Sequence, residues 1–253
     1  MVFKQVKHWF IARANAARWR AIHDWAETRK GVFKLARDGS GFAIEQSKAL
    51  PGPMRIEWGP SQRAYIPGHE LRMRCELKLH SDLQMMVLCR ELMDELEKSV
   101  FEAYTDTLKT RVDTDTPEEM RWLVMFPKYG GFQSKLVRQR FGALGVNKDL
   151  TGSWIEGEFS EYLAQASQDL LPEGHPIVIM SMRGNIYLRT SMPEADLDKI
   201  QALVKVLESA CREAQRVNAR VAEGGSPWPT TTSVAWQSSR PDEEQAPSSP
   251  SSS

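Results

Sequence analysis

The sequence predicts an α+β fold: an antiparallel sheet built from hairpins, with helices packed on it and a disordered C-terminal tail. Short runs of alternating apolar and polar residues are separated by turn residues, which is typical of hairpins. These runs are followed by segments whose apolar residues recur at helical spacing, and several of these segments begin with helix-capping residues. Because no strand–helix–strand alternation of the parallel kind appears, doubly wound nucleotide-binding folds are disfavoured.

Composition indicates an ordinary globular protein. The 253 residues are 41% hydrophobic and 26% charged, with 33 basic and 33 acidic side chains. No apolar run approaches the roughly 18 residues of a membrane span, and the N-terminus lacks an apolar signal region. The three cysteines, Cys75, Cys89 and Cys211, are too few for a disulfide framework. We therefore expect a soluble cytoplasmic protein with reduced thiols and no membrane span.

The pattern divides the chain into one α+β domain over residues 1–222 and a disordered tail over 223–253. The predicted elements are a helix at 2–29, hairpins within 32–79, a helix at 82–110, a mixed helical and strand region at 117–171, a hairpin at 176–190 and a helix at 193–217. The tail is rich in Ser and Pro and cannot bury enough apolar surface to offset its ordering entropy. Trp228 and Trp236 in this tail either belong to a short docking motif or bind nothing in particular.

The first predicted helix places small and aromatic side chains on one face, namely Phe3, Val6, Phe10, Ala14, Ala17 and Ala21. Gly31 can end it with a left-handed residue. The segment also carries five basic residues and no acid before Asp24, which would suit membrane-surface attachment or organelle targeting. Because Arg13 and Arg20 fall almost opposite the other basic residues, we favour an integral first helix.

Two hairpins are predicted next. Val32–Arg37 and Phe42–Gln46 flank the turn Asp38–Gly41, and a second pair of strands follows from Met54. Its return strand, 71–79, has the clearest alternation of the chain. The predicted core side is Leu71, Met73, Cys75, Leu77 and Leu79, and the predicted wet side is Arg72, Arg74, Glu76 and Lys78.

The helix predicted at 82–110 begins at a capping box, Ser81 to Gln84. Its apolar seam is Met86, Cys89, Met93, Leu96, Val100 and Ala103. We expect this seam to pack across the sheet, and the alternative is a homodimer through the same helix. Residues 117–126 follow a second capping box and favour helix, although Arg121 to Phe126 also suits a buried strand. Leu150 to Leu171 is predicted as one helix.

Enzyme and cofactor motifs are absent from the sequence. It has no G-x-x-x-x-G-K-[ST], no G-x-S-x-G, and no His or Cys spacing typical of zinc, so we predict no cofactor and no metal. Asp113, Asp115, Glu118 and Glu119 offer oxygen ligands for a divalent cation, but a solvated acidic loop before a helix N-terminus is the favoured interpretation.

The basic residues are concentrated early in the chain. Residues 1–80 carry a net charge of +8 and the remainder carries −8. Arg72, Arg74 and Lys78 lie on one side of a strand at intervals of about 6.6 Å or its double, and Arg55 and Arg63 could extend them. These five residues are the candidate binding surface. The alternative is that Glu57, Glu70 and Glu76 neutralise them as cross-strand ion pairs.

We therefore hypothesise a non-enzymatic intracellular binding or regulatory module that engages an acidic partner through its basic N-terminal third. The expected partner is another protein, with an anionic nucleic acid or lipid surface as the alternative. A different class of function also stays open: a hydrolase or group transferase without a recognisable motif, with a cleft near Tyr65, His69 and Arg72.

Overall fold

The computed structural model describes residues 19–105 and 117–223. Within these ranges nine strands form one antiparallel sheet in the order β1-β2-β3-β4-β9-β8-β5-β7-β6. The strands are β1 (Val32–Leu35), β2 (Phe42–Gln46), β3 (Met54–Pro60), β4 (His69–Glu76), β5 (Met85–Cys89), β6 (Lys128–Tyr129), β7 (Phe141–Gly145), β8 (Ile177–Met182) and β9 (Asn185–Ser191). The predicted α+β class with an antiparallel sheet is confirmed.

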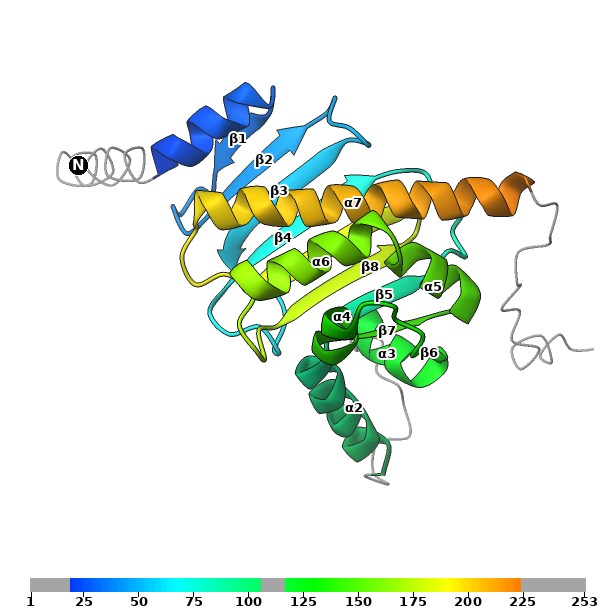
Figure 1. Cartoon of the computed structure of the whole chain (residues 1–253). Coiled ribbons are helices and arrows are strands. Elements are labelled where there is room, and N and C mark those ends of the chain that lie inside the picture. The colour runs from blue at the N-terminus through cyan, green and yellow to red at the C-terminus, as the bar shows by residue number, and fades with distance from the viewer. Residues whose placement is uncertain (1–18, 106–116, 224–253) are drawn as a thin grey trace, which may run out of the picture.

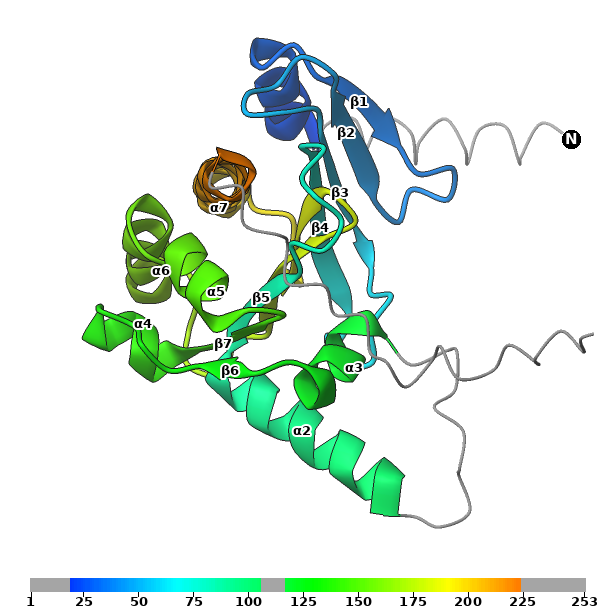
Figure 2. The ribbon, with the colours of Figure 1, turned by 90° about the vertical axis from the view of Figure 1, so that its right-hand side faces the viewer.

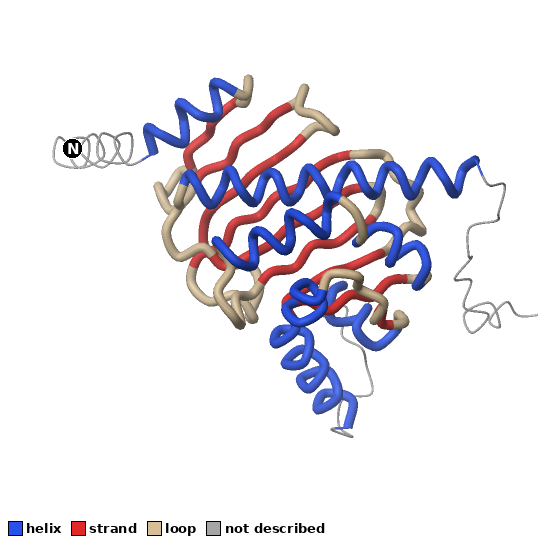
Figure 3. Tube along the Cα trace, viewed as in Figure 1, coloured by secondary structure: helices blue, strands red, loops and turns tan. Residues whose placement is uncertain are grey.

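Helices cover the sheet unequally. They are α2 (Arg90–Thr105), α3 (Glu118–Met125), α4 (Lys135–Arg140), α5 (Lys148–Ile155), α6 (Glu158–Asp169) and α7 (Leu197–Glu223), and residues 19–28 are also helical. Figures 1 and 3 show α5, α6 and α7 lying across one side of the sheet. Turned by 90°, Figure 2 shows α3 on the opposite side, next to the β5–β7 end. We call the side that carries α7 the helix face and the other side the second face.

The hairpins predicted from turn chemistry are confirmed. β1 pairs with β2 around the Asp38–Gly41 turn, β3 pairs with β4, and β8 pairs with β9. Arg183 and Gly184 both have positive φ, at 51° and 78°, as a tight two-residue hairpin turn requires. Alternation then places one set of side chains under α7. The buried set on β3 and β4 is Met54, Ile56, Trp58, Leu71, Met73 and Cys75.

The second face has two halves of different chemistry. On β5, β7 and β8 it presents Met86, Leu88, Leu144, Val178 and Met180, all buried. α2 and α3 cover this half, and Gly142 leaves room for the Met93 thioether of α2. On β1 to β4 and β9 the same face is polar. The wet side predicted for the 71–79 strand therefore lies on this uncovered half.

The helix predicted at 82–110 is wrong in its first third. Residues Met85–Cys89 form the central strand β5, and α2 starts at Arg90. All five strand residues are buried because both faces of this strand are covered, so they form a continuous apolar run that also satisfies a helical spacing. Of the rest of the predicted seam, Met93, Leu96 and Val100 are buried within the chain. The homodimer alternative therefore has no exposed seam over these residues.

Three other boundaries are also corrected. The helix predicted over 150–171 is two helices, α5 and α6, which are separated at Gly157 with a φ of 75°. The strand predicted over 71–79 ends at Glu76, because Lys78 has a φ of 56°. The C-terminal helix starts at Leu197 and runs to Glu223, later at both ends than the predicted 193–217. Helix was the favoured prediction for 117–126, and α3 confirms it.

The first helix is described from residue 19 onward. Trp19, Ile22 and Ala26 are its buried residues, and Trp19 packs against Phe42 and Trp58 with ring centroids 5.3 and 5.2 Å apart. Ala21 is exposed, which contradicts its place on the predicted core face. The remaining residues of that predicted face, the basic residues before Arg20, and the tail tryptophans Trp228 and Trp236 lie outside the described residues. None of the described helices is long and apolar enough to cross a membrane.

Candidate binding surface on the second face

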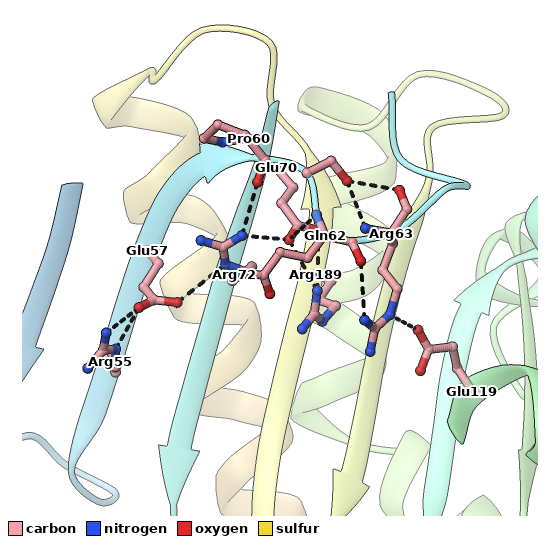
Figure 4. A network of polar contacts seen from close by, with 10 residues as sticks. Arg55, Glu57, Pro60, Gln62, Arg63, Glu70, Arg72, Glu119 and Arg189 are labelled. Carbon is pink, nitrogen blue, oxygen red and sulfur yellow. Dashed lines mark hydrogen bonds and ion pairs between the residues drawn. The ribbon is translucent and has the colours of Figure 1, made fainter. Parts of the chain in front are cut away.

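The half of the second face that no described helix covers, on β1 to β4 and β9, carries a network of mostly charged side chains, and we call it the open face. Register and alternation place these residues on it: Lys34, Glu45, Arg55, Glu57, Glu70, Arg72, Arg74, Glu76, Tyr187 and Arg189. Figure 4 shows the network that joins several of them, with the helices of the other face behind the sheet. Five of the ten are basic and four are acidic, so the surface as a whole is close to neutral.

Two pairs of arginines lie directly opposite each other across this surface. Arg55 on β3 faces Arg74 on β4, and Arg72 on β4 faces Arg189 on β9. Directly opposed side chains have Cβ atoms about 4.5 to 5.5 Å apart, and like charges at such positions are destabilising. Each pair therefore needs anionic partners, from the chain itself or from a ligand.

Glu70 supplies the anion for one pair from inside the protein. Its side chain has no exposed surface, and its Oε1 accepts hydrogen bonds from Arg72 Nη1 at 2.9 Å and Arg189 Nη1 at 3.1 Å. The same oxygen accepts from the Gln62 backbone N–H at 3.2 Å. Charge-assisted bonds of this kind hold both guanidinium groups in place at the centre of the open face (Figure 4).

The other arginine pair, Arg55 and Arg74, is held by glutamates beside it on the same two strands. Arg55 Nε donates to Glu57 Oε1 at 2.7 Å, and Arg74 Nη2 donates to Glu76 Oε1 at 2.6 Å. The hydrogen bond to Glu57 raises the pKa of Arg55 further above its ordinary value, although partial burial opposes this. Arg72 also reaches Glu57 through its Nε, at 3.3 Å. Both arginines of this pair are about 45% exposed, so these outer ion pairs are strongly screened.

A hollow of about 210 Å³ lies between the two arginine pairs. It is lined by Arg55, Glu57, Gln62, Arg72, Met73, Arg74, Tyr187 and Arg189. The Nε and Nη2 groups of Arg189, and the Nε and Nη1 groups of Arg74, donate no hydrogen bond to any described residue. The hollow therefore holds guanidinium donors that are positioned by the chain but not saturated by it.

The five residues of the predicted surface are divided by the fold. Arg55, Arg72 and Arg74 line the hollow. Arg63 instead lies in the β3–β4 loop and pairs with the buried carboxylate of Glu119 on α3. Lys78 lies beyond the end of β4 and forms no ion pair with a described residue.

Tyr65, His69 and Arg72, the proposed catalytic group, do not converge. The Tyr65 hydroxyl donates to Glu119 Oε1 at 2.7 Å, and burial together with that negative charge raises the pKa of Tyr65 well above its ordinary value. His69 stacks on Trp58, with ring centroids 4.6 Å apart, on the helix face of β4. The three side chains therefore do not line one common cleft, which is the arrangement that the enzyme alternative predicted.

Two of the four carboxylates named as possible cation ligands are described by the structure, and both form ion pairs with arginines. Glu118 pairs with Arg183 at 2.6 Å, and Glu119 pairs with Arg63. Asp113 and Asp115 lie outside the described residues. Among the described residues, a surface cluster of His23, Asp24 and Glu27 has metal-ligand spacing, but exposed polar side chains of this kind are common on helices.

Comparison with protein-family models, with curated proteins and with solved structures gave no match. Two of the residues that matter most, Glu70 and Arg189, were not in the predicted surface. Arg189 sits between the buried residues Leu188 and Thr190 on β9, and this alternation was a signal that could have placed it on the wet side. Its contact with β4 depends on strand order, which the sequence does not reveal.

Proposed function

We propose that this protein is a non-enzymatic binding module that engages an acidic segment of another protein through its open face. The observation that carries the proposal is the hollow between two directly opposed arginine pairs, where Arg74 and Arg189 keep free guanidinium donors and Arg189 can take a carboxylate bidentately through Nε and Nη2. Because Glu70 already fixes Arg72 and Arg189, little side-chain entropy would be lost when a ligand binds.

The pattern of charge favours a protein segment over a nucleic acid. Glu45, Glu57 and Glu76 stand among the arginines and would repel a continuous row of phosphates. A short peptide can place one or two carboxylates over the hollow and leave neutral side chains above those glutamates. Complementarity of this kind gives specificity and register to an interface.

We also propose that the protein works in the cytoplasm. All three cysteines are buried and free, as is usual in a reducing compartment. The basic N-terminal third is partly neutralised by the rest of the chain, since Arg29 pairs with Glu208 at 2.5 Å and Arg63 pairs with Glu119. Within the described part of that third, this leaves the hollow as the feature best suited to an outside anion.

The test is a fluorescence anisotropy titration with a labelled acidic peptide of alternating Glu and Gly, at several salt concentrations. We expect binding that weakens as salt rises. Replacing both Arg74 and Arg189 with Gln should lower the affinity about a hundredfold or more, since each loses a charge-assisted bond worth about 1.5–3 kcal/mol. Arg138→Gln, at an exposed position on α4, is the matched control and should bind like the original protein.

Two results would overturn the proposal. One is binding that the double variant and the Arg138→Gln control weaken equally, because the effect would then follow net charge and not the hollow. The other is tighter binding to a single-stranded RNA of the same charge than to the peptide, which would make the partner a polyanion.

A further inference from the structure

A second cavity lies on the helix face, on the other side of the sheet from the hollow. Its volume is about 720 Å³, within the range of small-molecule sites. It forms where α6 ends and α7 begins, at the end of the sheet where these two helices come together (Figure 1). The loop 170–176 and the end of β9 close its sides.

The floor and walls of this cavity are apolar and fixed in place. Leu171, Met192 and Leu203 are buried, and Leu170 and Leu197 are half-buried on the wall. The segment around Met192 is held by its backbone: its N–H donates to the His69 carbonyl at 3.0 Å, and its carbonyl accepts from Trp58 Nε1 at 2.8 Å. A cavity built in this way is formed before any ligand arrives.

His175 belongs to the lining of the cavity, and the contacts of its ring determine which nitrogen can accept a hydrogen bond. Its Nε2 lies 3.0 Å from the Ser191 carbonyl, which can only accept, and 3.0 Å from Thr190 Oγ1. The Thr190 hydroxyl already donates its hydrogen to the Pro176 carbonyl at 3.0 Å. The proton of the neutral ring must therefore sit on Nε2, which leaves a lone pair on Nδ1 with no hydrogen bond to a described residue. Burial lowers the pKa of His175, so the neutral ring is the form present near pH 7.

Among the other charged side chains of the lining, carboxylates outnumber ammonium groups. Glu194 and Asp196 bring two carboxylates, and Lys199 brings one ammonium group. Asp196 uses Oδ1 to cap α7, accepting from the backbone N–H groups of Asp198 at 2.9 Å and Lys199 at 3.2 Å, and its other oxygen has no such bond. The polar part of the cavity is therefore net negative and rich in acceptors, beside a wall of leucines.

We infer that this cavity binds a small amphipathic amine: an ammonium group hydrogen-bonded at His175 Nδ1 and near Glu194, with an aliphatic or aromatic body against Leu170, Leu197 and Leu203. The site is separate from the open face and does not depend on the proposed function. Burial of the ligand body against the apolar wall is favourable, and the carboxylates of the lining attract a positively charged head group.

The test uses three probes of equal length and different charge: octylamine, octan-1-ol and octanoate. Titrations of protein with labelled methyl groups, followed by NMR, should shift the methyl signals of Leu170, Leu171, Leu197 and Leu203. We expect octylamine to bind about tenfold tighter than octan-1-ol, and octanoate to bind weakest. Intermolecular NOEs between the octyl chain and these methyl groups would locate the ligand without any variant.

Two pairs of variants sharpen the result. Leu197→Trp should obstruct the apolar wall where the ligand body lies and strongly weaken binding, whereas Leu35→Trp, at an exposed edge position on β1, should not. Glu194→Gln should reduce the preference for the amine several-fold, whereas Glu161→Gln, exposed on α6 and outside the lining, should leave it unchanged. The inference fails if octanoate binds as tightly as octylamine, if Leu197→Trp binds normally, or if the NOEs arise elsewhere.

Discussion

Glu70 is the internal anion on which the open face depends, and replacing it with Gln tests that role. The carboxylate has no exposed surface and accepts three hydrogen bonds through one oxygen, two of them from arginines. Removing one partner of a fully buried pair costs about 3–5 kcal/mol. Here the arginine side chains are 17% and 22% exposed, and Gln keeps one acceptor oxygen, so we expect a loss of about 2–4 kcal/mol in the free energy of unfolding.

The matched control is Glu76→Gln on the same strand and the same face. Glu76 pairs with Arg74 at 2.6 Å, but the two side chains are 49% and 44% exposed. An exposed pair of this kind contributes little, and its loss should change stability by about 0.5 kcal/mol or less. Both variants can be compared by urea denaturation at neutral pH, provided the slope of the transition stays the same.

A double-mutant cycle with Arg189→Gln separates charge from packing. If Glu70 acts through Arg189, the double variant should be less destabilised than the sum of the single variants, by about 1–2 kcal/mol. Equal effects of Glu70→Gln and Glu76→Gln, or additive effects in the cycle, would refute the argument. Glu70 would then be an ordinary member of the network.

Three further predictions concern the rest of the fold. Met73→Ala should cost about 2–5 kcal/mol because Met73 is buried under the helices, whereas Arg74→Ala, next to it on the open face, should cost about 0.5 kcal/mol or less by the same urea assay. The pKa of His175, followed by NMR, should lie below its ordinary value of 6.5. Because the unfolded chain then binds more protons than the folded chain as pH falls below about 6.5, the free energy of unfolding should decrease over that pH range. The decrease should be smaller in His175→Gln. Truncation after Glu223 should change the melting temperature by no more than roughly 3 °C, and a larger drop by calorimetry would show that the tail docks on the domain.

Hairpins were predictable because their signals are local. Turn residues such as Asp38–Gly41 and Arg183–Gly184 fix the register of adjacent strands, and a period of two then assigns each side chain to a face. The central strand β5 was not predictable in this way. Covered on both sides, it has no polar face, and Met86, Cys89 and Met93 fit a helical stripe as well as a strand followed by a helix.

The candidate site was predictable only in part, because it depends on strand order. Arg55, Arg72 and Arg74 come from one hairpin, so their common surface follows from local pairing. Arg189 arrives from a strand more than a hundred residues later, and the buried state of Glu70 depends on the arginines that surround it. A single sequence does not show that β4 and β9 are neighbours.

The division of the second face explains why the described helices α2 and α3 leave the open half uncovered. α2 and α3 pack on the part of the sheet where the strands present Met86, Leu88 and Leu144, because burying these side chains is favourable. Advancing over Arg72 and Arg189 would bury charges that Glu70 only partly compensates, at a cost that apolar contact does not offset. The pairing of Arg63 and Tyr65 with Glu119 marks this limit, because it ties the edge of α3 to the β3–β4 loop. The partner that we propose for the open face would therefore bring the anions that the described helices do not supply there.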